Sequence, residues 1–241
     1  MIQKENPSSK KKTAIVTAAG KGIGAAIARE LATSDYNLVL ASNSGGAMAL
    51  AAELGGVGLT GSVTDPNHLQ ELVALAVDSY GRIDAVVNNT GHPPKGPLLE
   101  IPDEAWHDGL DLLLLNVIRM ARLVTPIMQQ QGGGAIVNIS TFSAFEPDAT
   151  FPVSSSLRAA LAGFCKMYAD QYASDGIRMN NLLPGFMDNY PESDVVVNRI
   201  PLGRYASVKE IAKSARFLLE PDSAYITGQN LRADGGLTRS L

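Results

Sequence analysis

The chain has 241 residues, of which 45% are hydrophobic and 18% are charged, and these values are typical of a folded globular protein with a well-buried core. Its formal net charge of −4 gives no electrostatic basis for binding nucleic acid or a membrane surface. A single cysteine, Cys165, excludes an internal disulfide and a cysteine-rich metal site, and the chain shows neither a signal peptide nor a long apolar run, so we expect a cytoplasmic protein without a bound metal.

The chain opens with a polar stretch, residues 1–12, which we interpret as a flexible lead-in. Short apolar runs then predict strands at 13–18, 37–41, 57–61, 84–89, 134–140, 177–183 and 228–233. Apolar residues at intervals of three and four predict helices at 22–34, 45–54, 65–81, 103–130, 154–176 and 207–220. Asp65 and Ser207 precede two of these helices as expected N-caps, and Ser154 is a candidate N-cap for the helix predicted from 154.

Strands that are apolar throughout and alternate with helices indicate a parallel sheet covered on both faces. The chain shows no linker, internal repeat or low-complexity block. We therefore predict one doubly wound α/β domain over residues 1–241, with about seven strands. In such sheets ligands bind beyond the carboxyl ends of the strands, so the loops that follow the strands hold the candidate site.

The first of these loops lies in VTAAGKGIG, residues 16–24. Glycines between a strand and a helix let a pyrophosphate approach backbone N–H groups at the positive end of the helix. Glycines also serve tight packing, so the turn alone leaves both roles open. Its position between the first strand and the first helix favours binding.

Four later segments occur in the same order as in one known family: VVNNTG (86–91), IVNIS (136–140), LLPGFMDN (182–189) and YITGQNLRADGG (225–236). With the glycine turn, they make residues 13–236 resemble the short-chain dehydrogenase/reductases, in the style of the 3-oxoacyl-acyl-carrier-protein reductase branch. The resemblance implies a Rossmann-type domain, an NAD or NADP cofactor, and a small-molecule carbonyl or alcohol substrate.

The resemblance also implies a set of cofactor-binding residues. Those near the pyrophosphate and adenosine are Gly20, Lys21, Gly22, Ile23, Gly24, Asn43, Ser62 and Val63, and those near the nicotinamide are Asn89, Thr90, Gly91, Arg158, Pro184, Gly185 and Met187. Ala18 replaces the first glycine of the family's turn. The second predicted strand ends in Ser42 and Asn43 rather than in the acid that favours NAD. Because Lys21 could meet a 2′-phosphate, the sequence favours NADP slightly.

The family's catalytic Asn, Ser, Tyr and Lys correspond to Leu113, Thr141, Ser154 and Arg158 in this chain. The segment AALAGF, residues 159–164, fixes this alignment because it follows the lysine position directly. Thr141 keeps a hydroxyl, but Ser154 is a much poorer acid than a phenol and Leu113 offers no hydrogen bond. Arg158 keeps a charge and donors for a ribose but cannot exchange its proton near neutrality. The resemblance therefore implies slow or altered chemistry, because the usual tyrosine–lysine mechanism is not possible.

Three functions stay open. The first is an oxidoreductase with a rebuilt proton donor, either His92, which titrates near neutrality, or a water held by Thr141 and Ser154. The second is a non-redox enzyme on the same scaffold, dehalogenase-like or lyase-like. The third is a catalytically silent dinucleotide-binding subunit or sensor. In relatives, helices corresponding to 113–128 and 154–172 form subunit contacts, so we expect a homotetramer or homodimer.

Overall fold

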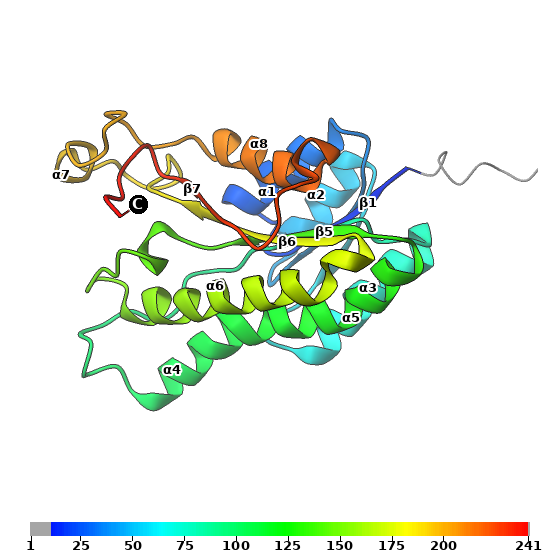
Figure 1. The fold of residues 1–241 in the computed structure, drawn as a ribbon, viewed down its shortest axis with the longest axis horizontal. Coiled ribbons are helices and arrows are strands. Elements are labelled where there is room, and N and C mark those ends of the chain that lie inside the picture. Colours follow the sequence, from blue (N-terminus) through cyan, green and yellow to red (C-terminus); the bar gives the residue numbers. More distant parts are fainter. Residues whose placement is uncertain (1–10, 241) are drawn as a thin grey trace, which may run out of the picture.

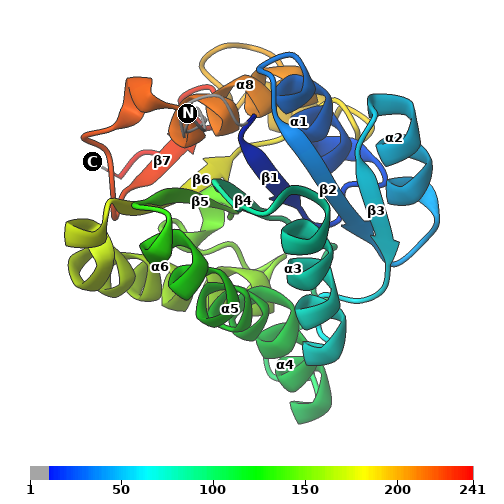
Figure 2. The ribbon, with the colours of Figure 1, turned by 90° about the vertical axis from the view of Figure 1, so that its right-hand side faces the viewer.

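A computed structural model describes residues 11–240 (Figure 1). Seven parallel strands form one sheet in the order β3-β2-β1-β4-β5-β6-β7, which confirms the predicted doubly wound topology (Figure 2). The strands are β1 (Thr13–Val16), β2 (Asn37–Ser42), β3 (Val57–Thr60), β4 (Ala85–Asn88), β5 (Gly134–Ile139), β6 (Ile177–Pro184) and β7 (Asn230–Ala233). The strand order reverses between β1 and β4, and a doubly wound sheet binds its ligand at that point.

Helices cover both faces of the sheet, as Figure 2 shows. The helices α1 (Gly22–Ala32), α2 (Gly46–Leu54) and α8 (Val208–Leu219) pack on one face. The helices α3 (Pro66–Tyr80), α5 (Asn116–Gln130) and α6 (Pro152–Tyr172) pack on the other, where α4 (Asp103–Leu110) leads into α5. A short helix, α7 (Asp194–Val197), lies between β6 and α8.

Each central strand contributes side chains to both cores. On β1, Val16 packs with the α1 and α8 core, whereas Ile15 packs with the α3 and α5 core. On β4, Val87 and Val86 divide in the same way. Successive side chains of a strand point to opposite faces, so a sheet covered on both faces needs strands that are apolar throughout. This is the pattern from which the sheet was predicted.

Two predicted helices differ from the structure. The segment 103–130 is not one helix, because the five residues Asp111–Leu115 form a π-helical turn between α4 and α5. The helix expected from Ser154 begins two residues earlier, at Pro152, and Phe151 is its N-cap without a side-chain hydrogen bond. Ser154 therefore lies inside the first turn of α6, and its prediction as an N-cap is wrong.

The other two expected helix starts are confirmed. The carboxylate of Asp65 accepts a hydrogen bond from the backbone N–H of Asn67 at 2.9 Å. Ser207 and Glu210 form a reciprocal capping box, in which each side chain accepts a hydrogen bond from the other residue's backbone N–H. These contacts satisfy N–H groups that have no partner within the helix.

The predicted lead-in falls mostly on residues 1–10, which lie outside the described part of the chain. At its end, Lys11 forms an ion pair with Asp35 at 3.0 Å, and Lys12 forms one with Glu220 at 3.1 Å. The carbonyl oxygen of Lys12 also accepts a hydrogen bond from the N–H of Asn37, at the start of β2.

Candidate cofactor and substrate site

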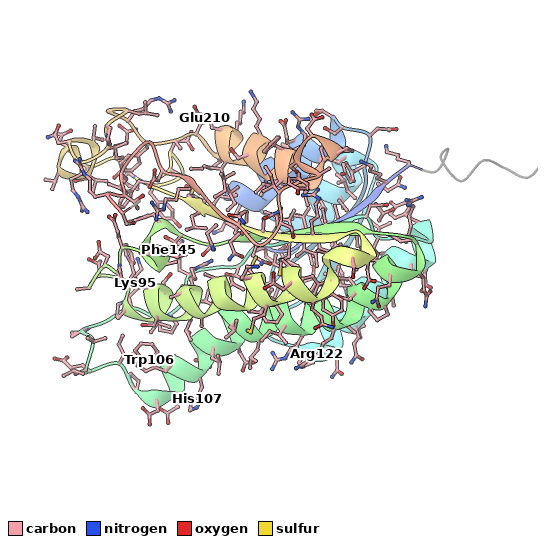
Figure 3. The ribbon with its side chains drawn as sticks, in the orientation of Figure 1. Lys95, Trp106, His107, Arg122, Phe145 and Glu210 are labelled. Atoms are coloured by element: carbon pink, nitrogen blue, oxygen red, sulfur yellow. The ribbon has the colours of Figure 1, made fainter. Side chains whose placement is uncertain are left out.

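The predicted site residues come from loops that gather at the carboxyl end of the sheet. In Figure 1 this is the left side of the molecule, where the loops after β4, β5 and β6 lie together with the first turns of α6. Lys95, from the loop after β4, and Phe145, from the segment after β5, are both found at this end in Figure 3. Segments far apart in the sequence therefore meet there.

The loop after β1 is tied to the loop after β4. The Thr17 hydroxyl donates a hydrogen bond to the carbonyl of Asn89 at 2.7 Å and accepts one from its N–H at 2.9 Å. The Asn89 side-chain amide donates to the carbonyl of Ala18 at 3.3 Å. Gly24 packs directly on this corner, since a Cβ there would lie 2.9 Å from the carbonyl carbon of Ala18 and 2.8 Å from the Asn89 amide nitrogen. Packing alone thus requires a glycine at position 24.

The start of α1 has the features of a phosphate cradle. Its N-cap, Lys21, makes no side-chain capping bond, so the N–H groups of Gly22, Ile23 and Gly24 have no side-chain acceptor among the described residues. Gly22 has a φ of +58°, a conformation that glycine adopts without strain. Unpaired N–H groups at the positive end of a helix bind anionic oxygens, so these residues fit the pyrophosphate of a dinucleotide.

Ala18 lies in the turn with a φ of +46°, so its backbone is in the left-handed region, which glycine adopts without strain. A non-glycine residue in a left-handed conformation costs about 1–2 kcal/mol, which a glycine would relieve. Glycine also has more conformational entropy in the unfolded state, and this offsets about 0.5–1 kcal/mol of that gain. We expect Ala18→Gly to raise the free energy of unfolding by about 0.5–1 kcal/mol, measured by urea denaturation.

The neighbouring Ala19→Gly is the control for this effect, because Ala19 is fully buried and is not among the described residues with positive φ. It should lower stability by about 1–2 kcal/mol, since it loses a buried methyl and gains unfolded-state entropy. If both variants destabilise the protein equally, the strain at Ala18 is refuted.

The adenosine side of the site has no acidic residue where β2 ends. The Ser42 hydroxyl donates to the Ser44 carbonyl at 2.6 Å and accepts from the N–H of Ala47 at 3.1 Å, so it shapes the turn into α2. Gly20 lies against it, because a Cβ there would be 3.0 Å from the Ser42 oxygen. Asn43 is exposed at the rim of the site.

The residues after β3 divide between rim and core. The hydroxyl of Ser62 is paired with that of Thr64 at 2.7 Å. The side chain of Val63 is buried in the core that faces α3 and α5, so only its backbone could meet a ligand. Neither residue places a negative charge near the adenosine side.

On the nicotinamide side, Asn89 is buried, and the hydroxyl of Thr90 donates to the Gly91 carbonyl at 3.0 Å. A Cβ at Gly91 would have no atom within 4 Å, so this glycine borders open space. Gly185 is different, because a Cβ there would lie 2.9 Å from the Cα of Asp234. It is required for close packing on the segment after β7.

The last predicted cofactor residues are held by backbone contacts. Pro184 ends β6 and is buried, and Met187 forms an isolated parallel bridge with Ala206. The segment between them is anchored by an aromatic cluster in which Phe186 packs between Phe142 and Tyr205, with ring centroids 5.5 Å apart on each side. This cluster fixes the backbone that would face the nicotinamide.

The four positions that the resemblance assigns to catalysis lie directly after β5, in the first two turns of α6 and in the π-helical turn. Ser154 is half-buried in the first turn of α6, and Thr141 directly follows Ser140 at the end of β5, with the Ser143 hydroxyl 3.5 Å from its own. Leu113 is 2% exposed inside the π-helical turn, where it can make no side-chain hydrogen bond.

Arg158 is buried one turn behind Ser154. Its Nη1 donates to the carbonyl oxygen of Ile139, at the end of β5. Its Nε has no hydrogen-bond partner among the described residues. Burial lowers the pKa of the guanidinium to about 10, so it still carries its charge at neutral pH.

His92 joins two of the loops around the site. Its Nε2 contacts the hydroxyl of Tyr190, and the two rings meet edge to face with centroids 5.6 Å apart. Partial burial lowers the pKa of His92, and the positive charges of Lys95 and Arg158 lower it further. His92 therefore faces the same region as Arg158, with a phenol from the loop after β6 beside it.

Sequence reasoning missed a ladder of asparagines across four strands. Asn88 donates to Asn138 at 2.9 Å, Asn138 donates to Asn181 at 2.8 Å, and Asn181 donates to Asn230 at 2.8 Å. These residues are partners in the strand register, and the first three are buried. Each predicted strand of β4 to β7 shows its asparagine, but only the strand order reveals that they are neighbours.

Within residues 11–240, no helix is long and apolar enough to cross a membrane. In the same range, no three His, Cys, Asp or Glu side chains are grouped so that they could hold a metal ion.

A doubly wound parallel sheet with a glycine turn at its switch point defines the class of Rossmann-type α/β proteins. Residues 17–238 match the family model described as "Enoyl-(Acyl carrier protein) reductase". The 3-oxoacyl-[acyl-carrier-protein] reductase FabG of Escherichia coli (strain K12) is 32% identical over 94% of this chain and 97% of its own length. The corresponding reductase of Synechocystis sp. is 34% identical over 93% and 96%.

Among solved structures, L-sorbose reductase from Gluconobacter frateurii, complexed with NADPH and L-sorbose, matches with a TM-score of 0.89 and 28% identity, over 96% of this chain and 98% of that one. The chain therefore belongs to the short-chain dehydrogenase/reductase family and is similar to its 3-oxoacyl-acyl-carrier-protein reductase branch.

Proposed function

We propose that this protein is an NADP-preferring oxidoreductase that acts slowly on a carbonyl or alcohol of a small molecule, without the family's tyrosine–lysine pair. The observation that best supports dinucleotide binding is the cradle of uncapped N–H groups at Gly22, Ile23 and Gly24. The relatives support the reaction class, since both curated relatives are named as reductases and the sorbose reductase was solved with NADPH.

Each part of the site has a role in this proposal. The N–H groups at the start of α1 bind the pyrophosphate, and Asn89, Thr90 and Gly91 flank the nicotinamide ribose. Bound nicotinamide supplies or accepts a hydride. The hydroxyls of Thr141 and Ser154 hold the substrate oxygen, and His92 donates the proton.

The preference for NADP rests on charge. Asn43 at the end of β2 offers no carboxylate to the ribose hydroxyls, and Lys21 is exposed beside the cradle without an ion pair to a described residue. Fluorescence titration with NADPH and NADH tests this directly. We expect tighter binding of NADPH and a loss of that preference in Lys21→Ala. Failure of both dinucleotides to bind at millimolar concentration contradicts the proposed function.

Slow turnover follows from the substituted positions. Positioned acid–base catalysis contributes about 10²–10⁴-fold in rate, or roughly 3–5 kcal/mol, and His92 supplies only part of it, because Ser154 cannot act as a phenol does. Orienting the hydride donor against the carbonyl is a separate contribution that survives this loss. Steady-state assays on a carbonyl panel should therefore find measurable but low turnover.

A catalytically silent dinucleotide-binding subunit is the second candidate. It is favoured by the combination of an intact cradle with Leu113 buried where the family has a hydrogen-bonding asparagine. Dinucleotide binding without turnover of any carbonyl in the panel would support it. A third candidate, a non-redox enzyme, has no such observation, since it does not need the cradle.

We further propose that the protein acts as a cytoplasmic homotetramer. Large apolar side chains on several elements are exposed in the single chain, including Met167 on α6 at 65%, Phe217 on α8 at 39% and Leu231 on β7 at 37%. Burying them between subunits would be favourable. Size-exclusion chromatography with light scattering should give four chains, and a monomer would contradict the proposal.

The role of His92 predicts a pH dependence. Reduction needs the protonated imidazole, and its pKa lies below the ordinary value of 6.5, so kcat for reduction should already fall as pH rises toward 6.5. His92→Gln should lower kcat about 10²-fold and remove this dependence. His107→Gln is the control, because His107 is exposed on α4, away from the loops of the site (Figure 3). Unchanged kinetics in His92→Gln would exclude His92 as the proton donor.

A further inference from the structure

Arg158 differs from every other cation in the described structure. It is the only lysine or arginine of residues 11–240 that is buried, at 9% exposure. Other arginines that are partly covered have carboxylates, such as Arg82 with Asp84 at 2.6 Å and Arg119 with Asp111 at 2.7 Å. No described carboxylate forms an ion pair with Arg158. An unpaired buried charge is costly, so its retention needs a reason.

Hydrogen bonds within the protein do not satisfy Arg158 either. A guanidinium has five N–H donors, of which Arg158 directs one, on Nη1, at the carbonyl of Ile139, while its Nε is buried without a partner. Arg178, which is also partly buried, donates instead to the carbonyls of Leu218, Glu220 and Ile226. Since Nη1 of Arg158 is engaged, Nε and Nη2 form the edge of the guanidinium that has no hydrogen-bond partner among the described residues.

The charges that act on His92 are positive. Burial lowers the pKa of His92, and the charges of Lys95 and Arg158 lower it further. The two acidic side chains between β5 and α6 are engaged by backbone N–H groups. Glu146 accepts from the N–H groups of Arg239 and Ser240, and Asp148 accepts from the N–H of Thr150 at 2.8 Å.

The titratable groups that face His92 and Arg158 thus include Tyr190 and Lys95 but no carboxylate paired with the guanidinium. Asp188, on the loop after β6, accepts a hydrogen bond from the N–H of Val208 at 3.0 Å. Because the described residues offer Arg158 no carboxylate, we expect its negatively charged partner to be a group of the ligand.

We propose that Arg158 is a substrate-specificity residue that binds a carboxylate through its Nε and Nη2 edge, so that the substrate is a small oxo acid or hydroxy acid. Carboxylate and guanidinium match as a pair of parallel, charge-assisted hydrogen bonds. This inference rests on the proposed function for the statement that the substrate carries a carbonyl or alcohol. The binding of an anion by Arg158 does not depend on the proposed function. A phosphate offers the same pair of oxygens, and the experiment separates the two.

The test is isothermal titration calorimetry with malonate and with inorganic phosphate, at constant ionic strength set by chloride, on the protein alone and on the protein saturated with NADP. We expect malonate to bind in both states, more tightly than phosphate. Arg158→Met should weaken malonate binding at least tenfold, and Arg158→Lys should weaken it less, because lysine keeps the charge but not the fork. Arg232→Met is the matched control, since it removes one positive charge at the same end of the sheet, where the Arg232 guanidinium lies over the ring of Phe145.

Arg158→Met should also have a melting temperature at least equal to that of the wild type, because it removes a buried charge without a partner. Equal malonate affinity in the wild type and Arg158→Met overturns the inference. Stronger binding of phosphate than of malonate also overturns the inference. If malonate never binds and Arg158→Met loses NADPH binding, Arg158 binds the ribose of the cofactor and the inference is again overturned. Titration of the same samples with NADPH keeps the two proposals apart, because the cofactor can fail to bind while the anion still does.

Discussion

The double variant Ser154→Tyr/Arg158→Lys is expected to reduce neutral carbonyl substrates about 10²–10⁴ times faster than the wild-type protein, the range that positioned acid–base catalysis contributes. A phenol is a far stronger acid than the serine hydroxyl, and an ammonium group one helical turn away lowers its pKa from about 10. Both positions lie on α6, whose first turns are already fixed by Pro152 and by packing of Val153. The gain should appear in kcat, followed by the absorbance of NADPH.

The matched control is Ser156→Tyr/Arg158→Lys. Ser156 is exposed, whereas Ser154 is half-buried at the site, so the control adds the same phenol on the same helix without placing it against the substrate. We expect the control to stay at the wild-type rate. Equal rates in the wild type and in both double variants would mean that the cleft no longer holds a carbonyl against the cofactor, and would favour a silent subunit.

The second large effect is expected at the centre of the asparagine ladder. Asn138→Leu removes the acceptor for the Asn88 amide and the donor for the Asn181 carbonyl, both in the interior. Each buried polar group left unsatisfied costs about 1–3 kcal/mol, so with two such groups we expect the free energy of unfolding to fall by about 2–6 kcal/mol in urea denaturation. Leucine has a similar volume, so little of this loss comes from an unfilled cavity.

The matched control for the ladder is Asn230→Leu. Asn230 stands at the end of the ladder on the edge strand β7, is only half-buried, and accepts one hydrogen bond, from Asn181. We expect it to lower stability by about 1 kcal/mol, since one interior donor loses its partner. If Asn138→Leu is as stable as the wild type, the ladder contributes nothing to the fold.

The sheet could be predicted from the sequence because its cause is local. Strands such as β1 and β4 must be apolar on both faces, and this requirement appears directly in runs such as 13–16 and 85–88. The π-helical turn at Asp111–Leu115 could not be predicted, because its leucines continue the helical pattern of both neighbours. The start of α6 at Pro152 shows a signal that could have been used, since proline is favoured in the first turn.

The site was predictable as a set of loops but not as a set of interactions. The glycine turn lies between β1 and α1 as predicted from the sequence, whereas the left-handed conformation of Ala18 and the hydrogen bond that its carbonyl accepts from Asn89 had no signal in the sequence. That Arg158 has no carboxylate partner also follows only from tertiary structure. A sequence shows which charges are present but not which of them meet.

The most direct test of the account is a crystal structure of the protein soaked with NADPH. We predict density for the pyrophosphate at the N–H groups of Gly22, Ile23 and Gly24, and for the nicotinamide ribose beside Asn89, Thr90 and Gly91. Serine and arginine side chains should border the nicotinamide where relatives have tyrosine and lysine. An empty cradle at saturating NADPH, or a tyrosine phenol and a lysine amine meeting beside the nicotinamide, would contradict it.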